Sequence, residues 1–242
     1  MIQNKVIILG NQKSGTSAIA SLLGIACGLE YQIDIPCLWP PVVSKIRSGE
    51  INFHSLVINN QAQFNAPLLK EPNFTFIYDH IANYFNNCQF VFISREPKEN
   101  IRSLLNRLRI KGNHQNKTFE DFDLTEVERA VLDPSRLGQT YSHYIEVLAD
   151  RWKLATDVYL ESKSTLNLVR YEDFCKNKEQ YILNLADLLK LQANNSISDL
   201  VDKQFQSKGK KVLNYRMFYG AANFQKINNI CCNNAKQMGY DV

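Results

Sequence analysis

A glycine-bracketed loop near the N-terminus holds the residues of this chain that are best suited to chemistry. Gly10 and Gly15 have the G-x-x-x-x-G spacing of a loop that surrounds a phosphate with backbone amides. A Walker loop has a lysine directly after its second glycine, but here Thr16 takes that place and the lysine comes earlier, as Lys13. The loop therefore predicts a phosphate or sulfate site in which Lys13 supplies the positive charge.

A second basic residue follows a later apolar run. Arg95 comes just after the apolar residues 90–93, and Ser103 stands eight positions further on. Pro97 is suited to the first turn of a helix, because no backbone donor is needed there, so Ser103 is expected about two turns inside that helix. An anion held by Arg95 is then within reach of the Ser103 hydroxyl.

The patterning around these residues predicts the fold. Residues 5–9, 66–69, 90–93 and 165–169 are short apolar runs, typical of strands buried on both faces of a parallel sheet. Helical spacing follows the first run from Thr16 and the third run from Pro97. We therefore expect an α/β fold of the P-loop NTPase-like kind, with three α/β/α layers and a central parallel sheet.

The remaining segments complete this picture. Further helical patterns cover residues 125–132, 141–159, 181–191 and 221–238, and the polar stretch 111–123 predicts a surface loop or lid. No linker divides the chain, so residues 1–242 are expected to form one domain.

Composition limits the partners of the protein. Of the 242 residues 45% are hydrophobic, and 28 basic against 24 acidic residues leave a net charge of +4, which suits a small anionic ligand and argues against nucleic acid. Six cysteines without CxxC spacing predict a reduced, metal-free protein. No apolar stretch has the length of a signal sequence or a membrane span, so we expect a cytoplasmic protein with no membrane partner.

The loop sequence Lys13-Ser14-Gly15-Thr16-Ser17 resembles the 5'-phosphosulfate loop of sulfotransferases that use 3'-phosphoadenosine 5'-phosphosulfate (PAPS). The resemblance implies that these five residues bind PAPS, that adenosine 3',5'-bisphosphate (PAP) is the product, and that no metal is required. It also implies that Lys13 is catalytic and stabilises the charge that develops on the leaving oxygen.

The pair Arg95 and Ser103 resembles the second half of the family's signature, which implies that both residues bind the 3'-phosphate. Tyr171 lies in a segment similar to the family's R-Y-E-D and is implied to lie near the adenine; the alternative is an aromatic that packs beside the sheet. Lys208 and Gly209 resemble the R-K-G that covers the 3'-phosphate, although a serine replaces the arginine, and a basic turn that faces water remains an alternative.

Lys70 begins a Lys-Glu-Pro segment similar to the K-D/E-P of bacterial and glycan-directed relatives. The resemblance implies a catalytic contact with the sulfuryl group or the acceptor. The alternative is a strand-end lysine paired with Glu71 or another carboxylate.

The sequence offers four candidates for the general base that removes the proton of the acceptor. His54 is favoured as the catalytic base because its ordinary pKa suits proton transfer near neutral pH. Glu50 is the second choice, and Glu30 and Asp34 complete the set; all three carboxylates need burial to raise their basicity.

The acceptor is expected to be a small molecule with a hydroxyl or an amine, and residues 31–41, including Trp39, are candidates to line its pocket. The oligomeric state is open. Two other functions are weighed against sulfuryl transfer. A P-loop kinase is disfavoured by the missing Walker lysine, and a noncatalytic PAPS- or PAP-binding module would bind nucleotide without turnover.

Overall fold

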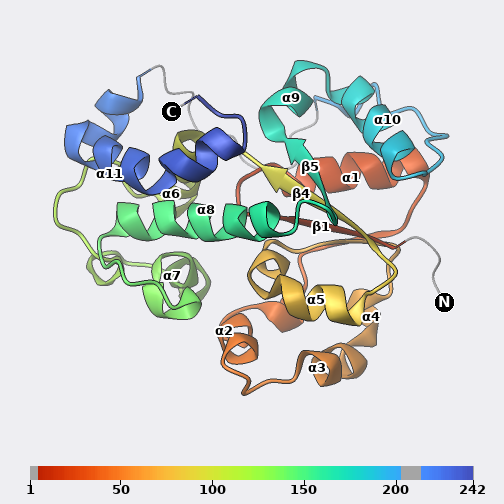
Figure 1. The fold of residues 1–242 in the computed structure, drawn as a ribbon, viewed down its shortest axis with the longest axis horizontal. Helices are drawn as coiled ribbons and strands as arrows, with labels where there is room; N and C mark the ends of the chain where they lie inside the picture. Colours follow the sequence, from red (N-terminus) through yellow and green to blue (C-terminus); the bar gives the residue numbers. More distant parts are fainter. Residues whose placement is uncertain (1–4, 203–213, 242) are drawn as a thin grey trace.

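The sheet of this protein contains parallel strands alone in the residues that the structure describes. The structure is a computed structural model that describes residues 5–202 and 214–241, so Lys208 and Gly209 lie outside the described residues. The strands are ordered β2-β3-β1-β4-β5, and each pairs in parallel with its neighbours. Their bounds are β1 (Val6–Gly10), β2 (Tyr31–Ile33), β3 (Leu68–Lys70), β4 (Gln89–Ser94) and β5 (Leu166–Arg170). The predicted α/β fold is confirmed (Figure 1).

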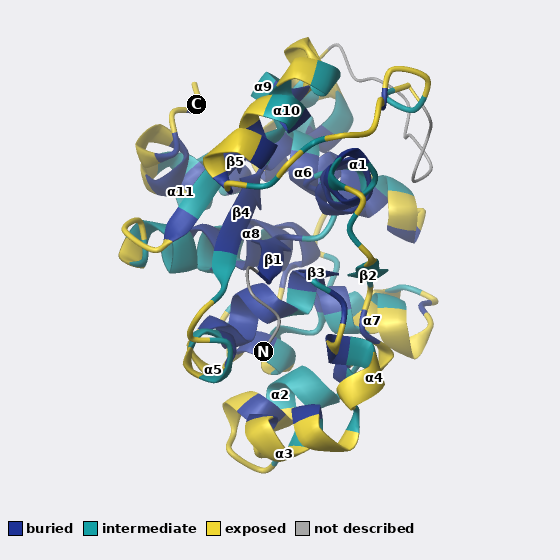
Figure 2. Cartoon of the chain, turned by 90° about the vertical axis from the view of Figure 1, so that its right-hand side faces the viewer, coloured by how far each residue is buried: buried dark blue, intermediate teal, exposed yellow. Residues whose placement is uncertain are grey.

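Helices cover both faces of this sheet, because successive side chains of a strand point to opposite faces. Ile8 belongs to a core cluster with α1 (Thr16–Cys27), α9 (Tyr171–Lys176) and α10 (Lys178–Leu188). Leu9, the next residue, belongs to the opposite cluster. That cluster includes residues of α5 (Tyr78–Tyr84), α6 (Pro97–Leu108), α8 (Tyr144–Glu161) and α11 (Tyr215–Gln237). The central strands β1, β3 and β4 are therefore buried on both sides, as the dark central elements of Figure 2 show.

Short helices complete the described chain. They lie mainly between β2 and β4 and between α6 and α8: η1 (Pro36–Leu38), α2 (Val42–Arg47), α3 (Phe53–Asn59), α4 (Gln61–Phe64), η2 (Pro72–Ile77), η3 (Phe119–Asp121), α7 (Glu126–Leu132) and η4 (Pro134–Leu137). None of the helices in the described ranges is long and apolar enough to cross a membrane.

Helices α8, α10 and α11 begin at residues other than those predicted; α10 begins at Lys178 and ends at Leu188, three residues earlier at each end than the predicted 181–191. The helix α11 begins at Tyr215 and not at residue 221. Gly220, with φ of 71°, kinks the helix, and the hydrophobic pattern predicted only the part that follows this kink. The helix α8 begins at Tyr144 because His143 caps it: the ring nitrogen Nδ1 accepts the amide of Ile145 at 3.3 Å.

The strand connections leave a crevice at the carboxyl edge of the sheet. The chain leaves β1 toward the α1 face, whereas it leaves the neighbouring strands β3 and β4 toward the opposite face, through η2 and α6. Loops that diverge in this way open a space above the strand ends, where parallel α/β sheets bind their ligands.

Candidate active site

The loop between β1 and α1 has a backbone that few residues other than glycine permit. Gly10 has φ of 136°, and a Cβ atom there would lie 2.3 Å from the carbonyl oxygen of Ile93. Lys13 lies in the left-handed region, with φ of 66°. Gly15, with φ of 91°, caps α1 without a side-chain hydrogen bond, and the N-terminal end of such a helix favours an anion.

A buried asparagine on α6 holds this loop in place. Asn100 has 0% exposure, and its Nδ2 donates to the carbonyl oxygen of Gln12 at 2.9 Å and to Ser14 Oγ at 3.0 Å. Its Oδ1 accepts Asn11 Nδ2 at 3.0 Å. Sequence reasoning did not find Asn100; the available signal was a polar residue among apolar ones on the core side of the helix that Pro97 opens.

We expect Asn100→Ala to lower the free energy of unfolding by about 2–4 kcal/mol, because it leaves the Asn11 amide and the Ser14 hydroxyl buried without this partner. Urea denaturation followed by circular dichroism measures the change. Asn184→Ala, at an exposed position of α10, is the control and should stay within about 0.5 kcal/mol of the unmodified protein. An equally small effect at Asn100 would show that the network adds little stability.

Arg95 joins the loop to the start of α6. Its Nη1 donates to the carbonyl oxygen of Lys13 at 3.0 Å, and its guanidinium carbon lies 4.7 Å from the centre of the Tyr171 ring. Tyr171 in turn packs against the loop so closely that a Cβ on Gly15 would lie 2.2 Å from its ring. The structure therefore brings together three elements that the sequence placed at one site: the loop, Arg95 and Tyr171.

A carboxylate on α6 balances the charge of this region. Glu99 accepts Arg95 Nη2 at 2.9 Å, Arg102 Nη2 at 2.8 Å and the Tyr215 hydroxyl at 2.8 Å. Partial burial opposes the ionisation of Glu99, but the hydrogen bonds and charges of these partners outweigh it and hold the pKa of Glu99 below its ordinary value. Ser103, buried one helical turn after Glu99, shares that side of α6.

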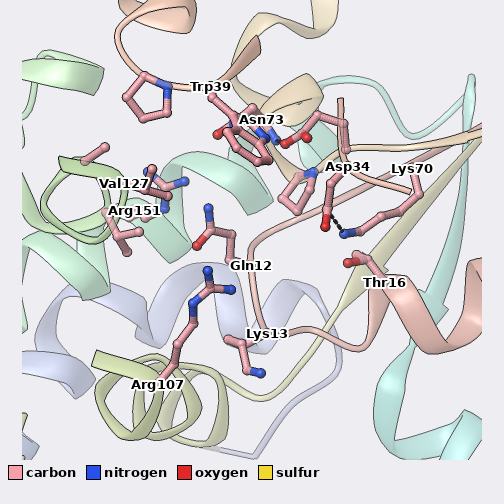
Figure 3. Close-up of a pocket in the computed structure, with 15 residues that line it drawn as sticks. Gln12, Lys13, Thr16, Asp34, Trp39, Lys70, Asn73, Arg107, Val127 and Arg151 are labelled. Atoms are coloured by element: carbon pink, nitrogen blue, oxygen red, sulfur yellow. Dashed lines mark hydrogen bonds and ion pairs between the residues drawn. The ribbon is translucent and has the colours of Figure 1, made fainter. Parts of the chain in front are cut away.

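A cavity of about 190 Å³ occupies the crevice beside the loop. Its wall combines basic, acidic and apolar residues, several of which Figure 3 labels. The lining residues are Gln12, Lys13, Thr16, Asp34, Trp39, Pro40, Lys70, Glu71, Pro72, Asn73, Arg107, Val127, Ala130, Val131 and Arg151. Three of them come from α7, whereas residues 111–123, the expected lid, contribute none.

Lys70 reaches this cavity from the end of β3. Its side chain is 2% exposed, and its Nζ forms an ion pair with Asp34 Oδ1 at 2.6 Å (Figure 3). The partner carboxylate belongs to Asp34, which follows β2 and is 50% exposed, and not to the adjacent Glu71. The ion pair therefore holds the Asp34 carboxylate beside Lys70 on the wall of the cavity.

The Glu71 carboxylate binds backbone amides instead of Lys70. Its two carboxylate oxygens accept the backbone amides of Ile35 and Asn73, each at 2.9 Å, and so tie the loop after β2 to the end of β3. Burial raises the pKa of Glu71. The pKa of Lys13, by contrast, is lowered. Burial is the largest cause, and the positive charges of Arg107, Arg95 and Lys70 follow.

The other candidates for the base lie away from the cavity. His54 is exposed on α3, and its ring centre lies 4.9 Å from that of Tyr84. Glu50 is also exposed, and its carboxylate accepts a hydrogen bond from the Ser48 hydroxyl at 2.8 Å. Glu30 is exposed just before β2, at the amino ends of the parallel strands, whereas the cavity lies at their carboxyl ends. Of the four candidates, Asp34 alone lines the cavity.

The fold and this site define a class of protein. A parallel α/β sheet with an anion-binding loop after its first strand and basic residues at the neighbouring strand ends is typical of P-loop-like nucleotide-binding proteins. A family model described as a sulfotransferase domain matches residues 3–219 of the chain. The protein belongs to the sulfotransferase family.

Solved structures have the same fold at low sequence identity. A sulfotransferase domain from the curacin biosynthetic pathway is 13% identical, with a TM-score of 0.57 over 99% of this chain and 98% of that chain. A sulfotransferase from Mycobacterium avium is 9% identical, with a TM-score of 0.58 over 100% and 78% of the two chains. A mouse sulfotransferase complexed with PAP is 13% identical, with a TM-score of 0.54 over 97% and 85%. A search of curated protein sequences found no match.

Proposed function

We propose that this sulfotransferase moves the sulfuryl group of PAPS to a hydroxyl or amine of a small-molecule acceptor and releases PAP. The observation that carries the proposal is the 3.0 Å hydrogen bond from Arg95 to the carbonyl oxygen of Lys13, because it joins the two halves of the family's nucleotide signature. These halves lie 82 positions apart in the sequence.

In the proposed complex the two halves bind different ends of the nucleotide. Residues 13–17 surround the 5'-phosphosulfate with backbone amides, hydroxyls and the Lys13 ammonium, and Arg95 with Ser103 binds the 3'-phosphate. Tyr171 supports the site by holding the Arg95 guanidinium over its ring. Burial raises the pKa of Tyr171 to about 12, so its hydroxyl remains protonated near neutral pH.

The proposed chemistry is an in-line displacement at sulfur. The acceptor oxygen or nitrogen forms a bond to sulfur while the bond from sulfur to the phosphate oxygen breaks, and PAP leaves with the bonding electrons. Lys13 neutralises the negative charge that develops on that leaving oxygen. Asp34 takes the proton of the acceptor, because it is the one candidate base that lines the cavity.

The setting of the enzyme is part of the proposal. A cavity of about 190 Å³ suits a small acceptor. All six cysteines are unpaired, which agrees with a cytoplasmic location.

The nucleotide site is tested with ligands that need no knowledge of the acceptor. We expect PAP to raise the melting temperature of the protein more than ADP or magnesium-ATP does, since PAP alone carries the 3'-phosphate. Arg95→Ala should weaken PAP binding by about 10- to 100-fold in calorimetry and Ser103→Ala by less, because a charged donor contributes more than a hydroxyl.

The control is Arg129→Ala, an exposed arginine of α7 that does not line the cavity. Its affinity for PAP should equal that of the unmodified protein. Preference for magnesium-ATP, or binding of PAP and ADP with equal affinity, would contradict the proposed function.

A further inference from the structure

A buried arginine on the wall of the cavity has no acidic partner. Arg151, from α8, is 3% exposed. Its Nε donates to Asn11 Oδ1 at 3.2 Å, and its guanidinium carbon lies 4.4 Å from the centre of the Phe76 ring. Within residues 5–202 and 214–241, Arg151 forms no ion pair with a carboxylate, and the contact of Nε with Asn11 is its one side-chain hydrogen bond.

The closest source of negative charge is already engaged. Glu71 acts on Arg151 electrostatically, but both of its oxygens accept backbone amides. Burial dominates and lowers the pKa of Arg151 to about 10, which still leaves the guanidinium charged at neutral pH. A buried charge without a paired counter-charge is costly, so its presence in a ligand cavity points to a ligand that supplies the counter-charge.

We propose, building on the sulfotransferase function above, that Arg151 binds a carboxylate of the acceptor, which is a hydroxy or amino carboxylic acid. The free terminal nitrogens of one guanidinium match a planar group with a single negative charge. Figure 3 shows Arg151 and Val127 on one side of the cavity and Asp34 with Lys70 on the other. A small acid can therefore place its carboxylate at Arg151 and its nucleophile near Asp34.

The rest of the wall suits the body of such an acid. Gln12 lies between the two ends of the cavity (Figure 3). The remaining contacts are largely apolar and fit a short carbon skeleton or one aromatic ring. They come from Trp39, Pro40, Pro72, Val127, Ala130 and Val131.

The test compares acids with their neutral counterparts. The probes are 4-hydroxybenzoate, 4-hydroxyphenylacetate and 3-(4-hydroxyphenyl)propionate, each paired with its primary amide, and calorimetry measures their binding with and without PAP. At least one acid should bind about tenfold or more tightly than its amide, and Arg151→Met should remove the difference. Arg151→Lys keeps the charge and should retain part of the preference. Arg129→Met is the matched control and should keep all of it.

A second measurement is independent of any probe. Arg151→Met should raise the melting temperature of the ligand-free protein, because it removes a buried charge that no carboxylate neutralises. An arginine with a purely structural role would give a lower melting temperature.

Four results would overturn the proposal. They are equal binding of acids and amides, no binding of any acid, an acid preference that survives Arg151→Met, and a loss of melting temperature in that variant. A fifth result, weaker binding of PAPS with unchanged binding of PAP in Arg151→Met, would assign the arginine to the donor and so overturn the proposal as well. Since the acids are titrated without turnover, these outcomes differ from failure of the unmodified protein to bind PAP, which would contradict the proposed function itself.

Discussion

Lys13→Ala is expected to lower kcat for transfer from PAPS by about 10²- to 10³-fold, the usual effect of removing one donor that stabilises transition-state charge. The ammonium counts most when the bond from sulfur to the leaving oxygen breaks, so PAP affinity should fall by much less than kcat. The rate is measured in a reaction of PAPS with an accepted acid or phenol, in which chromatography quantifies the PAP released. Lys117→Ala, in an exposed ion pair with Asp121, is the control.

The pH dependence of binding gives a second view of Lys13. Burial, followed by the charges of Arg107, Arg95 and Lys70, lowers its pKa from the ordinary 10.5, so the free protein releases this proton at a lower pH. PAP brings negative charge and favours the protonated form. PAP should therefore bind more weakly as pH rises through the lowered pKa of Lys13, and binding should be accompanied by uptake of a proton.

Unchanged kcat in Lys13→Ala would contradict the catalytic role of the residue.

Asp34→Asn is expected to lower kcat by about 10²- to 10⁴-fold, the range for loss of a general base. Asparagine keeps an oxygen that accepts a hydrogen bond from Lys70, so the change removes the base while preserving this contact. Steady-state kinetics with PAPS and an accepted acceptor compare the kcat of the variant with that of the unmodified protein.

Two controls separate this role from damage to the fold. Asp199→Asn, at an exposed position, should keep full activity, and the melting temperature of Asp34→Asn shows whether Lys70 tolerates the change. A comparison with His54→Ala decides between the two assignments of the base. A large loss of kcat in His54→Ala with normal kcat in Asp34→Asn would identify the histidine as the base.

The parts of the site that the sequence predicted are those whose geometry is local. Residues 13–17 follow a strand and begin a helix, so their spacing alone predicts an anion site. Arg95 and Ser103 are likewise related by one strand end and one helix. The fold could be predicted for the same reason, because alternating apolar strands and helices specify a parallel sheet. The strand β2 was missed because three half-buried residues make no distinct pattern.

Contacts between distant segments could not be predicted from spacing. Lys70 and Asp34 lie 36 positions apart, and Arg151 and Asn11 lie 140 apart. The interpretation of His54 rested on the ordinary pKa of histidine, which carries no information about position. In the structure, α3 holds that ring against Tyr84 and outside the cavity.

The shared oxygen of Asn11 has a thermodynamic consequence. Asn11 Oδ1 accepts both the Gln12 amide, at 3.0 Å, and Arg151 Nε, while the amide nitrogen of the same side chain donates to Asn100. A displacement of Arg151 therefore acts directly on the loop that contains Lys13. By linkage, any effect of an occupant at Arg151 on the affinity of the loop for nucleotide equals the effect of nucleotide on the affinity for that occupant. Asn11 thus joins the arginine proposed to bind the acceptor to the loop proposed to bind the donor.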